Sequence, residues 1–362
     1  MLSDKMAVQI RKPEPRKKRG KFHRIILLIL AGAVVISLVA AWSLFNMILK
    51  PNVTVPGGKA SLYIPSGSTY QDVKGILKSN AWLRNSSSFE WMAQRKNYPA
   101  RVKPGHYIIH NGMSNNSLVN MLRSGVQTPV DVTFNNILNK EELAGKIAGQ
   151  IEADSLSLIE CWNDKEFLKS LNTNPAKVIM LFLPDTYELW WTTSAREFTQ
   201  RMAKESDRFW NEERLKKGRD ARMSREEVII LASIIEKETQ MNDEKPVMAG
   251  VYINRLKKGW PLQADPTVKF ALGRLDLKRV LKIHTEFDSP YNTYKYTGLP
   301  PGPICIPSKA SIEAVLNFRK HDYMFFCAKA DMSGYHVFSR TLAEHNRYAA
   351  AYQAELNRRR IR

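Results

Sequence analysis

The sequence predicts an α+β fold preceded by a single transmembrane helix, and three observations lead to this prediction. A long run without charged residues stands near the N-terminus. Strand-like and helix-like segments follow in a segregated order, which favours α+β over a doubly wound parallel sheet. The content of hydrophobic residues is 44% and that of aromatic residues 10%, enough for packed cores in two or three domains over 362 residues.

The transmembrane prediction is for residues 25–48, which carry no charge and would span a bilayer as a helix rising about 1.5 Å per residue. Residues 1–24 hold nine Lys and Arg against Asp4 and Glu14, a net charge of +7. The positive-inside rule therefore predicts a single-pass membrane protein with a cytoplasmic tail and with everything after residue 50 outside. A cleaved signal peptide is the alternative, but the apolar run is about twice as long as a signal-peptide core and lacks a small-x-small cleavage site.

The net charge of the whole chain is +20, so about +13 remains on the part predicted to lie outside. Such a surface suits anionic partners, for example cell-wall polymers, lipid headgroups or lipopolysaccharide, although a solvated basic face without a ligand fits equally well. The topology argues against nucleic acid as a partner. The odd and widely spaced cysteines, Cys161, Cys305 and Cys327, suggest neither a metal cluster nor a disulfide framework; a Cys305–Cys327 bridge stays open.

A small module is predicted for residues 60–126, after a linker at residues 49–59 that contains two prolines and paired glycines. Residues 60–111 have the pattern β-α-α-β, in which Ser68 or Thr69 can cap the first helix, and one more helix follows. This order and size resemble a LysM-like glycan-binding module.

The remaining chain, residues 127–362, is predicted to form a larger mixed α+β domain. A strand and a helix follow Val130, a short helix is expected at residues 162–171, and the motif "LFLPDTYELWW" places aromatic residues around a Pro-Asp turn. Two long helical patterns come next, "AREFTQRMAKESDRFWNEERLKK" and "SREEVIILASIIEKETQ". The second opens with Ser224 and Glu227 at the spacing of a capping box.

The motif "LASIIEKET" places two glutamates at the end of this apolar helix. At about 100° per residue from Leu231, Glu238 falls at roughly 340°, inside the apolar stripe, whereas Glu236 falls at roughly 140° on the opposite flank. A carboxyl group held against apolar neighbours has a raised pKa and keeps a proton available near neutral pH. The alternative is that the helix ends near Thr239, so that Glu238 reaches solvent in a frayed last turn.

Polar and aromatic residues gather in the loops after this helix. Stiff loops bearing such side chains suit a sugar, which offers apolar faces for stacking and hydroxyls for hydrogen bonds, although each residue alone also fits ordinary loop packing. The segment that contains Pro300 and Pro301 costs little to order on binding. His336 and His345 lie in a later motif, where a lone histidine is more often structural. The candidate sugar-binding residues are Gln263, Asp265, Thr267, Tyr291, Asn292 and Tyr294.

Four motifs in this order and spacing resemble the MltG/YceG-like family of endolytic murein transglycosylases, and the resemblance covers most of residues 60–355. The motifs are "LASIIEKET", "VYINRLKKGWPLQADPTVKFALG", "SPYNTYKYTGLPPGPICIPS" and "GYHVFSRTLAEHN". The resemblance implies that Glu238, the second glutamate of E-K-E-T, is the catalytic acid/base and that Glu236 is structural. The sequence departs from the family at Asn135 and Asn136, which replace a glycine-bearing strand end and tolerate the same left-handed turn, and at Cys305.

The resemblance also implies a reaction. Glu238 would cleave the bond between N-acetylmuramic acid and N-acetylglucosamine in peptidoglycan glycan strands, leaving 1,6-anhydromuramyl ends without a metal ion or cofactor. Nascent strands are the implied substrate and peptidoglycan synthases the implied partners. The implied location is the cell inner (cytoplasmic) membrane, with the catalytic domain periplasmic or otherwise extracytoplasmic. Two alternatives remain: a lysozyme-like hydrolase in which Asp265, otherwise a turn or cap residue, is the second carboxylate, and a cell-wall-binding scaffold without enzymatic activity.

Overall fold

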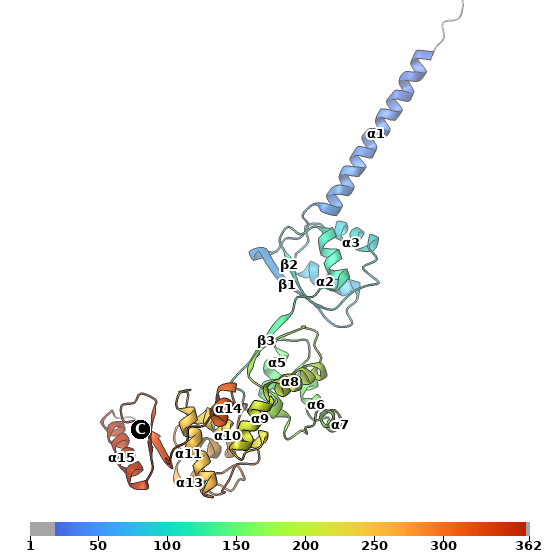
Figure 1. Ribbon diagram of the computed structural model, residues 1–362. Helices are drawn as coiled ribbons and strands as arrows, with labels where there is room; N and C mark the ends of the chain where they lie inside the picture. Colours follow the sequence, from blue (N-terminus) through green and yellow to red (C-terminus); the bar gives the residue numbers. More distant parts are fainter. Residues whose placement is uncertain (1–18, 360–362) are drawn as a thin grey trace, which may run out of the picture. The chain divides into compact units, whose positions relative to one another are not determined.

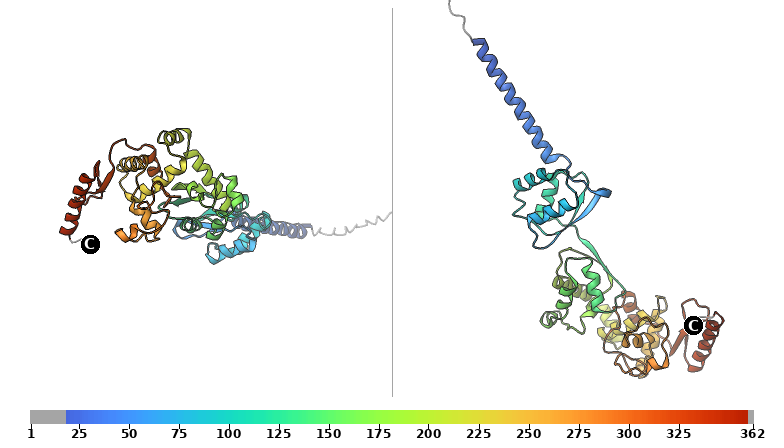
Figure 2. Two further views of the ribbon diagram at one scale, coloured as in Figure 1. Left: turned by 90° about the horizontal axis from the view of Figure 1, so that it is seen from below. Right: turned by 180° about the vertical axis from the view of Figure 1, so that it is seen from behind.

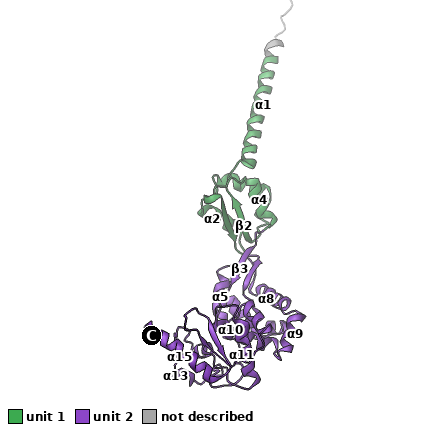
Figure 3. Ribbon diagram, turned by 60° about the vertical axis from the view of Figure 1, so that its left-hand side comes forward, with its two compact units in different colours: residues 1–126 green, residues 127–362 purple. Residues whose placement is uncertain are grey.

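The chain divides into two compact units, one ending at Val126 and the other beginning at Gln127 (Figure 3). The computed structural model describes residues 19–359, so most of the predicted basic tail, residues 1–24, lies outside the described residues. Each unit has its own hydrophobic core, and the second unit has two.

The first unit begins with helix α1, Arg19–Leu49. Within it, the segment Phe22–Leu49 is long and apolar enough to cross a membrane, and it is the one such helix among the described residues. The sequence predicted residues 25–48, so the helix continues past both ends of the uncharged run. Its last turn contacts the globular part of the unit, where the side-chain amide of Asn115 donates a hydrogen bond to the carbonyl of Met47 at 3.0 Å.

The globular part of the first unit has the predicted order β-α-α-β followed by a further helix. Its two strands pair antiparallel, from Lys59 opposite His110 to Ile64 opposite Gly105. Thr69 is the N-cap of the first helix, in a capping box with Asp72. The elements are β1 (Lys59–Ile64), α2 (Tyr70–Ser79), α3 (Ser86–Arg95), β2 (Gly105–His110) and α4 (Asn115–Ser124). The element order is confirmed, and the LysM-like character of the module stays a prediction.

The segment predicted as a linker, residues 49–59, is packed against this unit. Val53 and Val55 are buried in its core. The amide of Val53 donates a hydrogen bond to the carbonyl of Met113, and the buried side chain of Asn52 donates one to Asn115. The prolines and glycines of this segment therefore shape an ordered entry into the module, not a free linker.

The second unit is a mixture of helices and small sheets (Figure 1), and the predicted mixed α and β character is confirmed at this level. Its strands form antiparallel pairs, β3 with β4 and β5 with β6. The strands are β3 (Val130–Phe134), β4 (Asp185–Leu189), β5 (Phe325–Ala328) and β6 (His336–Ser339). The helices are α5 (Lys140–Ala148), α6 (Ser155–Cys161), α7 (Lys165–Ser170), α8 (Ala195–Phe209), α9 (Glu212–Asp220), α10 (Arg225–Glu238), α11 (Lys245–Lys257), α12 (Asp265–Ala271), α13 (Lys282–Thr285), α14 (Lys309–Leu316) and α15 (Leu342–Arg358), with a 3-10 turn at Val178–Leu181.

The first core of this unit lies between the β3–β4 pair and helices α5, α6 and α8. The short helix expected at residues 162–171 is present as α7 and is shorter than predicted, because Trp162 is the C-cap of α6 and Asp164 is the N-cap of α7. The motif "LFLPDTYELWW" contains strand β4, and the first long helical pattern breaks at Trp210 into α8 and α9. Asn136 has a φ of 51°, which confirms the predicted left-handed turn after β3.

The second core lies between α10, α11 and α14 (Figure 1). Ser224 and Glu227 form the predicted capping box at the start of α10. The loop predicted over residues 263–267 is shorter than expected, because α12 begins at Asp265. Cys161, Cys305 and Cys327 are all free thiols, so the Cys305–Cys327 bridge is not formed. Beside this core, the β5–β6 hairpin and α15 stand together as one group (Figure 2).

Candidate active site

Glu238 is the last residue of α10. Eight successive residues before it, Val228–Ile235, are buried, so the apolar stripe holds the helix in the core up to its last turn. Thr239 then adopts an extended backbone with φ −141° and ψ 143°, which ends the helix. The side chain of Glu238 is thus presented at the edge of the core by a helix that cannot shift without exposing its apolar face.

The carboxyl group of Glu238 faces a pocket of about 440 Å³. Burial raises the pKa of Glu238 to about 7, and the charge of Asp265 acts in the same direction, while Tyr252, Lys269 and Arg255 act against it. The helix does end beside Thr239, yet Glu238 does not extend into open solvent as that alternative supposes. The pocket is lined by Glu238, Arg255, Leu262, Gln263, Asp265, Tyr294, Phe325, Phe326, Cys327, Ala328, His336, Leu342 and His345.

Tyr252, on the neighbouring helix α11, is the direct hydrogen-bond partner of Glu238. Its hydroxyl donates to Oε1 of Glu238 at 2.6 Å, and its ring is fully buried and meets Phe326 edge to face. A phenol donating to a carboxylate favours the ionised form, so Tyr252 moderates the effect of burial on the pKa of Glu238. Burial raises the pKa of Tyr252 itself, and the charge of Glu238 raises it further. Tyr252 therefore stays protonated as a donor.

Arg255 lies one helical turn after Tyr252 and fixes the pocket wall. Its Nε donates to the carbonyl of Met324 at 2.8 Å and its Nη1 donates to the carbonyl of Leu262 at 2.6 Å. Only 7% of this residue is exposed. The guanidinium group therefore ties the loop before α12 to the segment before β5, and it brings a positive charge close to Glu238.

A second carboxylate, Asp265, lines the same pocket at the start of α12. The hydroxyl of Tyr294 donates a hydrogen bond to Oδ1 of Asp265 at 2.6 Å. Burial raises the pKa of Tyr294, and its hydrogen bond to Asp265 raises it further. The preceding residue, Ala264, is the N-cap and makes no side-chain capping bond, so Asp265 is a pocket residue and not the cap that its "ADPT" context predicts.

The structure separates the six predicted sugar-binding residues into two groups. Gln263, Asp265 and Tyr294 line the pocket with Glu238. Thr267, in the first turn of α12, and Asn292, in the following loop, are fully buried. Thr267 bonds to Ala264 and Thr293, and Asn292 donates to the carbonyls of Thr285 and Phe287. Tyr291 packs against Phe270 with ring centroids 4.9 Å apart. The last three residues support the loops and do not line the pocket.

Sequence reasoning missed the far wall of the pocket, which comes from β5, β6 and α15. His336 contributes to it, and Glu244 fixes this histidine by accepting hydrogen bonds from its backbone amide at 2.7 Å and from Nδ1 at 3.0 Å. Glu244 is itself 6% exposed. The paired strands "FFCA" and "HVFS" were the available signal, since a hairpin brings residues of separate motifs to one surface.

His345, on α15, completes this wall. Its ring stacks on Phe325 with centroids 5.5 Å apart, and its Nδ1 is buried without a hydrogen-bond partner among the described residues. Burial lowers the pKa of His345, and the charge of Arg255 lowers it further. The imidazole is therefore neutral at pH 7.

Glu236 has quite different surroundings, two residues before Glu238. Its Oε2 accepts hydrogen bonds from the hydroxyls of Ser308 and Ser311 at the start of α14, and from the buried ammonium of Lys245 at 3.3 Å. Burial works to raise the pKa of Glu236, but these donors together lower it below its usual value. Glu236 is therefore an ionised group that joins α10, α11 and α14.

These features define a class of protein: an α+β domain with one pocket carboxyl group that titrates near neutral pH, held by a buried tyrosine and placed beside a second carboxylate. That arrangement suits general acid–base chemistry. The model of the YceG-like family matches residues 62–351, and the chain belongs to this family.

Named relatives and a solved structure are similar over most of the chain. An endolytic murein transglycosylase of Bacillus subtilis is 31% identical, over 82% of this chain and 86% of the relative. One of Streptococcus pneumoniae is 26% identical over 80% of this chain, which spans 57% of that longer protein. The crystal structure of a YceG-like protein from Listeria monocytogenes is 29% identical with a TM-score of 0.55, and covers 81% of this chain and 99% of its own.

Proposed function

We propose that this protein is a lytic transglycosylase that cuts within murein glycan strands, with Glu238 as its acid and base. The observation that carries the proposal is the carboxyl group of Glu238, which has a pKa of about 7 and faces a pocket. Membership of the YceG-like family supports it, as do the relatives of B. subtilis and S. pneumoniae, whose names describe this activity.

In the first step, protonated Glu238 donates its proton to the oxygen that links N-acetylmuramic acid to N-acetylglucosamine. The bond between this oxygen and the muramyl anomeric carbon breaks, and its electron pair stays on the oxygen. The leaving sugar gains a hydroxyl group, and the muramyl ring develops oxocarbenium character. The negative charge of Asp265, whose carboxylate Tyr294 orients, stabilises this positive charge.

In the second step, the Glu238 carboxylate takes the proton of the muramyl 6-hydroxyl, whose oxygen attacks the anomeric carbon and closes the 1,6-anhydro ring. Glu238 regains its proton, so the cycle consumes no water and uses no metal ion or cofactor. The hydroxyl of Tyr252 donates to Glu238 at 2.6 Å and stabilises the carboxylate between the two steps. A pKa near neutrality suits a group that must act first as acid and then as base.

Gln263, Asp265 and Tyr294 are the residues that we propose to contact the glycan, since they share the pocket with Glu238. Phe325 and Phe326 on the opposite wall offer apolar surface for a sugar ring. Tyr291, Asn292 and Thr267 act indirectly, by holding the loops that present the first group.

The domain organisation belongs to the proposal as well. Residues 1–24 form a cytoplasmic tail, the apolar helix anchors the protein in the inner membrane, residues 60–126 are a LysM-like glycan-binding module, and residues 127–362 are the extracytoplasmic catalytic domain. The apolar segment Phe22–Leu49 supports the anchor. An anchored enzyme of this kind would meet nascent strands beside the membrane, where peptidoglycan synthases are the expected partners.

A lysozyme-like hydrolase is the second candidate, because Asp265 lines the same pocket as Glu238 and two carboxylates are what a hydrolase requires. In that reaction Asp265 would act as nucleophile or activate a water molecule. A third possibility is a scaffold that binds the wall without cutting it. The three functions differ in the product ends that they leave.

The deciding experiment is to digest purified peptidoglycan with the full chain in detergent micelles and with its Glu238→Gln variant, and to identify the product ends by mass spectrometry. Anhydromuramyl ends, lighter by one water molecule than reducing ends, are expected from the wild-type chain and not from the variant. Reducing muramic acid ends would establish the hydrolase and overturn the transglycosylase. Strands bound by both proteins but cut by neither would favour the scaffold.

A further inference from the structure

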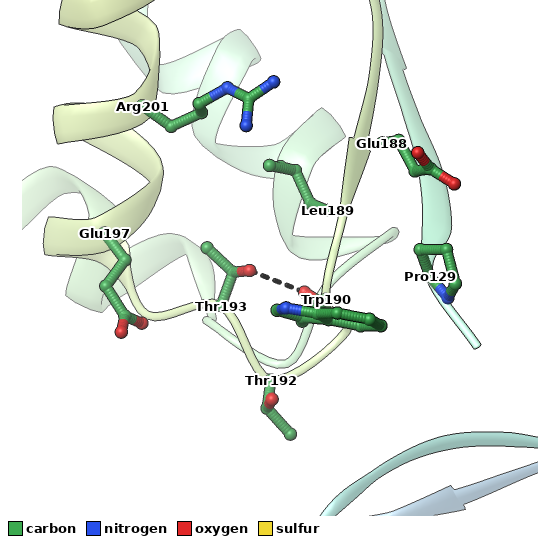
Figure 4. A pocket seen from close by; sticks show the side chains of 8 residues that line it. All are labelled: Pro129, Glu188, Leu189, Trp190, Thr192, Thr193, Glu197 and Arg201. Atoms are coloured by element: carbon green, nitrogen blue, oxygen red, sulfur yellow. Dashed lines mark hydrogen bonds between the residues drawn. The ribbon is translucent and has the colours of Figure 1, made fainter. Parts of the chain in front are cut away.

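A second pocket lies in the catalytic unit, where strand β4 ends and helix α8 begins. Its volume is about 500 Å³, and it shares no lining residue with the pocket of Glu238. Figure 4 shows Arg201 on α8 and Glu188 on β4 with Leu189 between them, and the indole of Trp190 below, beside Thr193. The lining residues are Pro129, Glu188, Leu189, Trp190, Thr192, Thr193, Glu197 and Arg201.

The indole of Trp190 is an open aromatic platform on an ordered turn of the backbone. It is 52% exposed, although the residues next to it are held firmly. Leu189 pairs with Val130 in the sheet, and both the amide and the hydroxyl of Thr193 donate hydrogen bonds to the carbonyl of Trp190, at 3.0 and 2.6 Å. Because this turn is set before any ligand arrives, stacking on the ring requires little further ordering of the backbone.

Polar groups surround this platform with unused hydrogen-bonding capacity. Glu188 is exposed, and its carboxylate forms no hydrogen bond or ion pair with any residue that the structure describes. Glu197 uses one carboxylate oxygen, Oε2, to accept from Ser194. Arg201 uses Nε to donate to Glu205, and its two terminal nitrogens make no hydrogen bond within the described chain. The pocket thus offers acceptors and a forked donor around an aromatic face.

The charges of the pocket select among possible ligands. Two carboxylates, Glu188 and Glu197, stand against one cation, Arg201, so the pocket would repel an anionic lipid headgroup or the lactyl carboxylate of N-acetylmuramic acid. A neutral sugar that carries an amide fits: its apolar face stacks on Trp190, its N–H donates to a carboxylate, and its carbonyl oxygen accepts from Arg201. N-acetylglucosamine, the uncharged sugar of a murein strand, has this chemistry.

We propose that the Trp190 pocket is a second glycan-binding subsite, which holds an N-acetylated sugar of the same strand away from the bond that faces Glu238. This proposal rests on the proposed function for the identity of the strand. Its consequence is a dependence on length: a strand long enough to occupy both pockets gains affinity from Trp190, and a short oligosaccharide bound at Glu238 does not.

The test compares Trp190→Ala with Trp190→Phe, which keeps an aromatic face, and with Leu156→Ala, which removes an exposed apolar side chain from α6 of the same unit. All are made in the full chain in detergent, in a Glu238→Gln background so that ligands stay intact. The probes are murein glycan strands freed of stem peptides and sorted into long strands and tetrasaccharides. Affinities are measured by titration calorimetry.

The expected result is that Trp190→Ala weakens binding of long strands roughly tenfold, as loss of one stacking contact implies. Its affinity for the tetrasaccharide stays unchanged, Trp190→Phe recovers most of the loss, and Leu156→Ala has no effect. Unchanged affinity for long strands would overturn the proposal. An equal loss for both ligand lengths would also overturn it.

A parallel digestion separates this test from that of the proposed function. If the chain with Glu238 intact leaves the same long strands uncut, the proposed function fails, while the calorimetric comparison of the Trp190 variants still decides whether the second pocket binds glycan. If the strands are cut and the Trp190 variants bind them like the parent, the subsite fails and the proposed function stands.

Discussion

Glu236 and Glu238 stand two residues apart on one helix, and their surroundings drive them to opposite states. Glu236 faces the start of α14, where two serine hydroxyls and the ammonium of Lys245 donate to it and lower its pKa. Glu238 faces a pocket where Tyr252 is its one hydrogen-bond donor among the described residues, and burial raises its pKa to about 7.

The difference shows that the donors and charges around a partly enclosed carboxyl group together decide its state. Burial acts on both residues and disfavours charge in both. At Glu236, three side-chain donors outweigh the effect of burial and lower the pKa. At Glu238, one donor does not outweigh burial, and the charge of Asp265 raises the pKa further. Glu236 is therefore ionised and stabilises the fold through its donors, whereas Glu238 keeps a proton that it can donate in a reaction.

The largest expected effect is on activity, in Glu238→Gln. Cleavage should fall roughly 10³-fold, because an amide cannot donate or accept the proton.

The same variant should also change stability. Since the raised pKa of Glu238 means that ionising this residue opposes folding, the Gln variant should unfold at a higher temperature than the wild type above pH 7. This advantage should vanish below pH 4.5, where Glu238 is protonated in both the folded and unfolded states. Anhydromuramyl product counts and thermal unfolding at pH 4 and pH 8, in about equal ionic strength, measure both effects.

The matched control is Glu236→Gln, which places the same substitution two residues away. Equal losses of cleavage per folded molecule in the two variants would contradict the division of roles between the glutamates.

The next largest effect is on stability, in Glu236→Gln itself. Removing this carboxylate leaves the ammonium of Lys245, whose side chain is 5% exposed, without its ion-pair partner. The free energy of unfolding should fall by about 3 kcal/mol and the Tm by roughly 6–12 °C. Because the pKa of Glu236 is lowered in the fold, the wild type should lose this advantage as the pH falls below 4.5. Thermal unfolding followed by circular dichroism measures the change.

A double variant, Glu236→Gln with Lys245→Met, tests the stated cause. It should recover part of the lost stability, because the uncompensated charge is gone. A double variant as unstable as the single one would mean that the serine hydroxyls, and not Lys245, carry the effect.

Much of this comparison was predictable from helical periodicity. Seven positions separate Leu231 from Glu238, about two turns, so the sequence alone assigns Glu238 to the apolar stripe and Glu236 to the other flank. The state of each carboxyl group was not predictable, because the donors come from distant segments. Ser308 lies 72 residues from Glu236, and Tyr252 reaches Glu238 only because α11 packs against α10.

The loops show the same limit. Polar residues in a stiff loop are equally typical of a binding surface and of a self-bonded loop, and residue type does not separate the two. Gln263 and Thr267 stand four positions apart, yet Gln263 lines the pocket and Thr267 is buried beneath it. The pocket wall from β5 and α15 required the pairing of Phe325 with Ser339, a non-local contact that no single segment encodes.

A smaller effect is expected on the pH dependence, in Tyr252→Phe. In the wild type, kcat/KM should fall tenfold per pH unit above about pH 7, as Glu238 loses its proton. Removing the hydroxyl of Tyr252 removes a donor that favours the carboxylate, so this limb should move to higher pH by roughly one unit. The pH profile of cleavage measures it, and a limb that stays near pH 7 would assign the titration to another group.

Asp265→Asn should move the same limb the other way and by less. The charge of Asp265 helps to raise the pKa of Glu238, but it ranks below burial as a cause, so its loss should lower the limb by a fraction of a pH unit. Asparagine keeps an oxygen that can accept from Tyr294, which preserves the local geometry. The pH profile of this variant should therefore keep its shape and shift toward lower pH, with cleavage reduced by the weaker stabilisation of the oxocarbenium charge.

Complete loss of cleavage at every pH would instead indicate that Asp265 takes part in bond making, as the hydrolase requires. Because Tyr252→Phe and Asp265→Asn alter one donor and one charge around the same carboxyl group, opposite shifts would locate the titrating proton on Glu238.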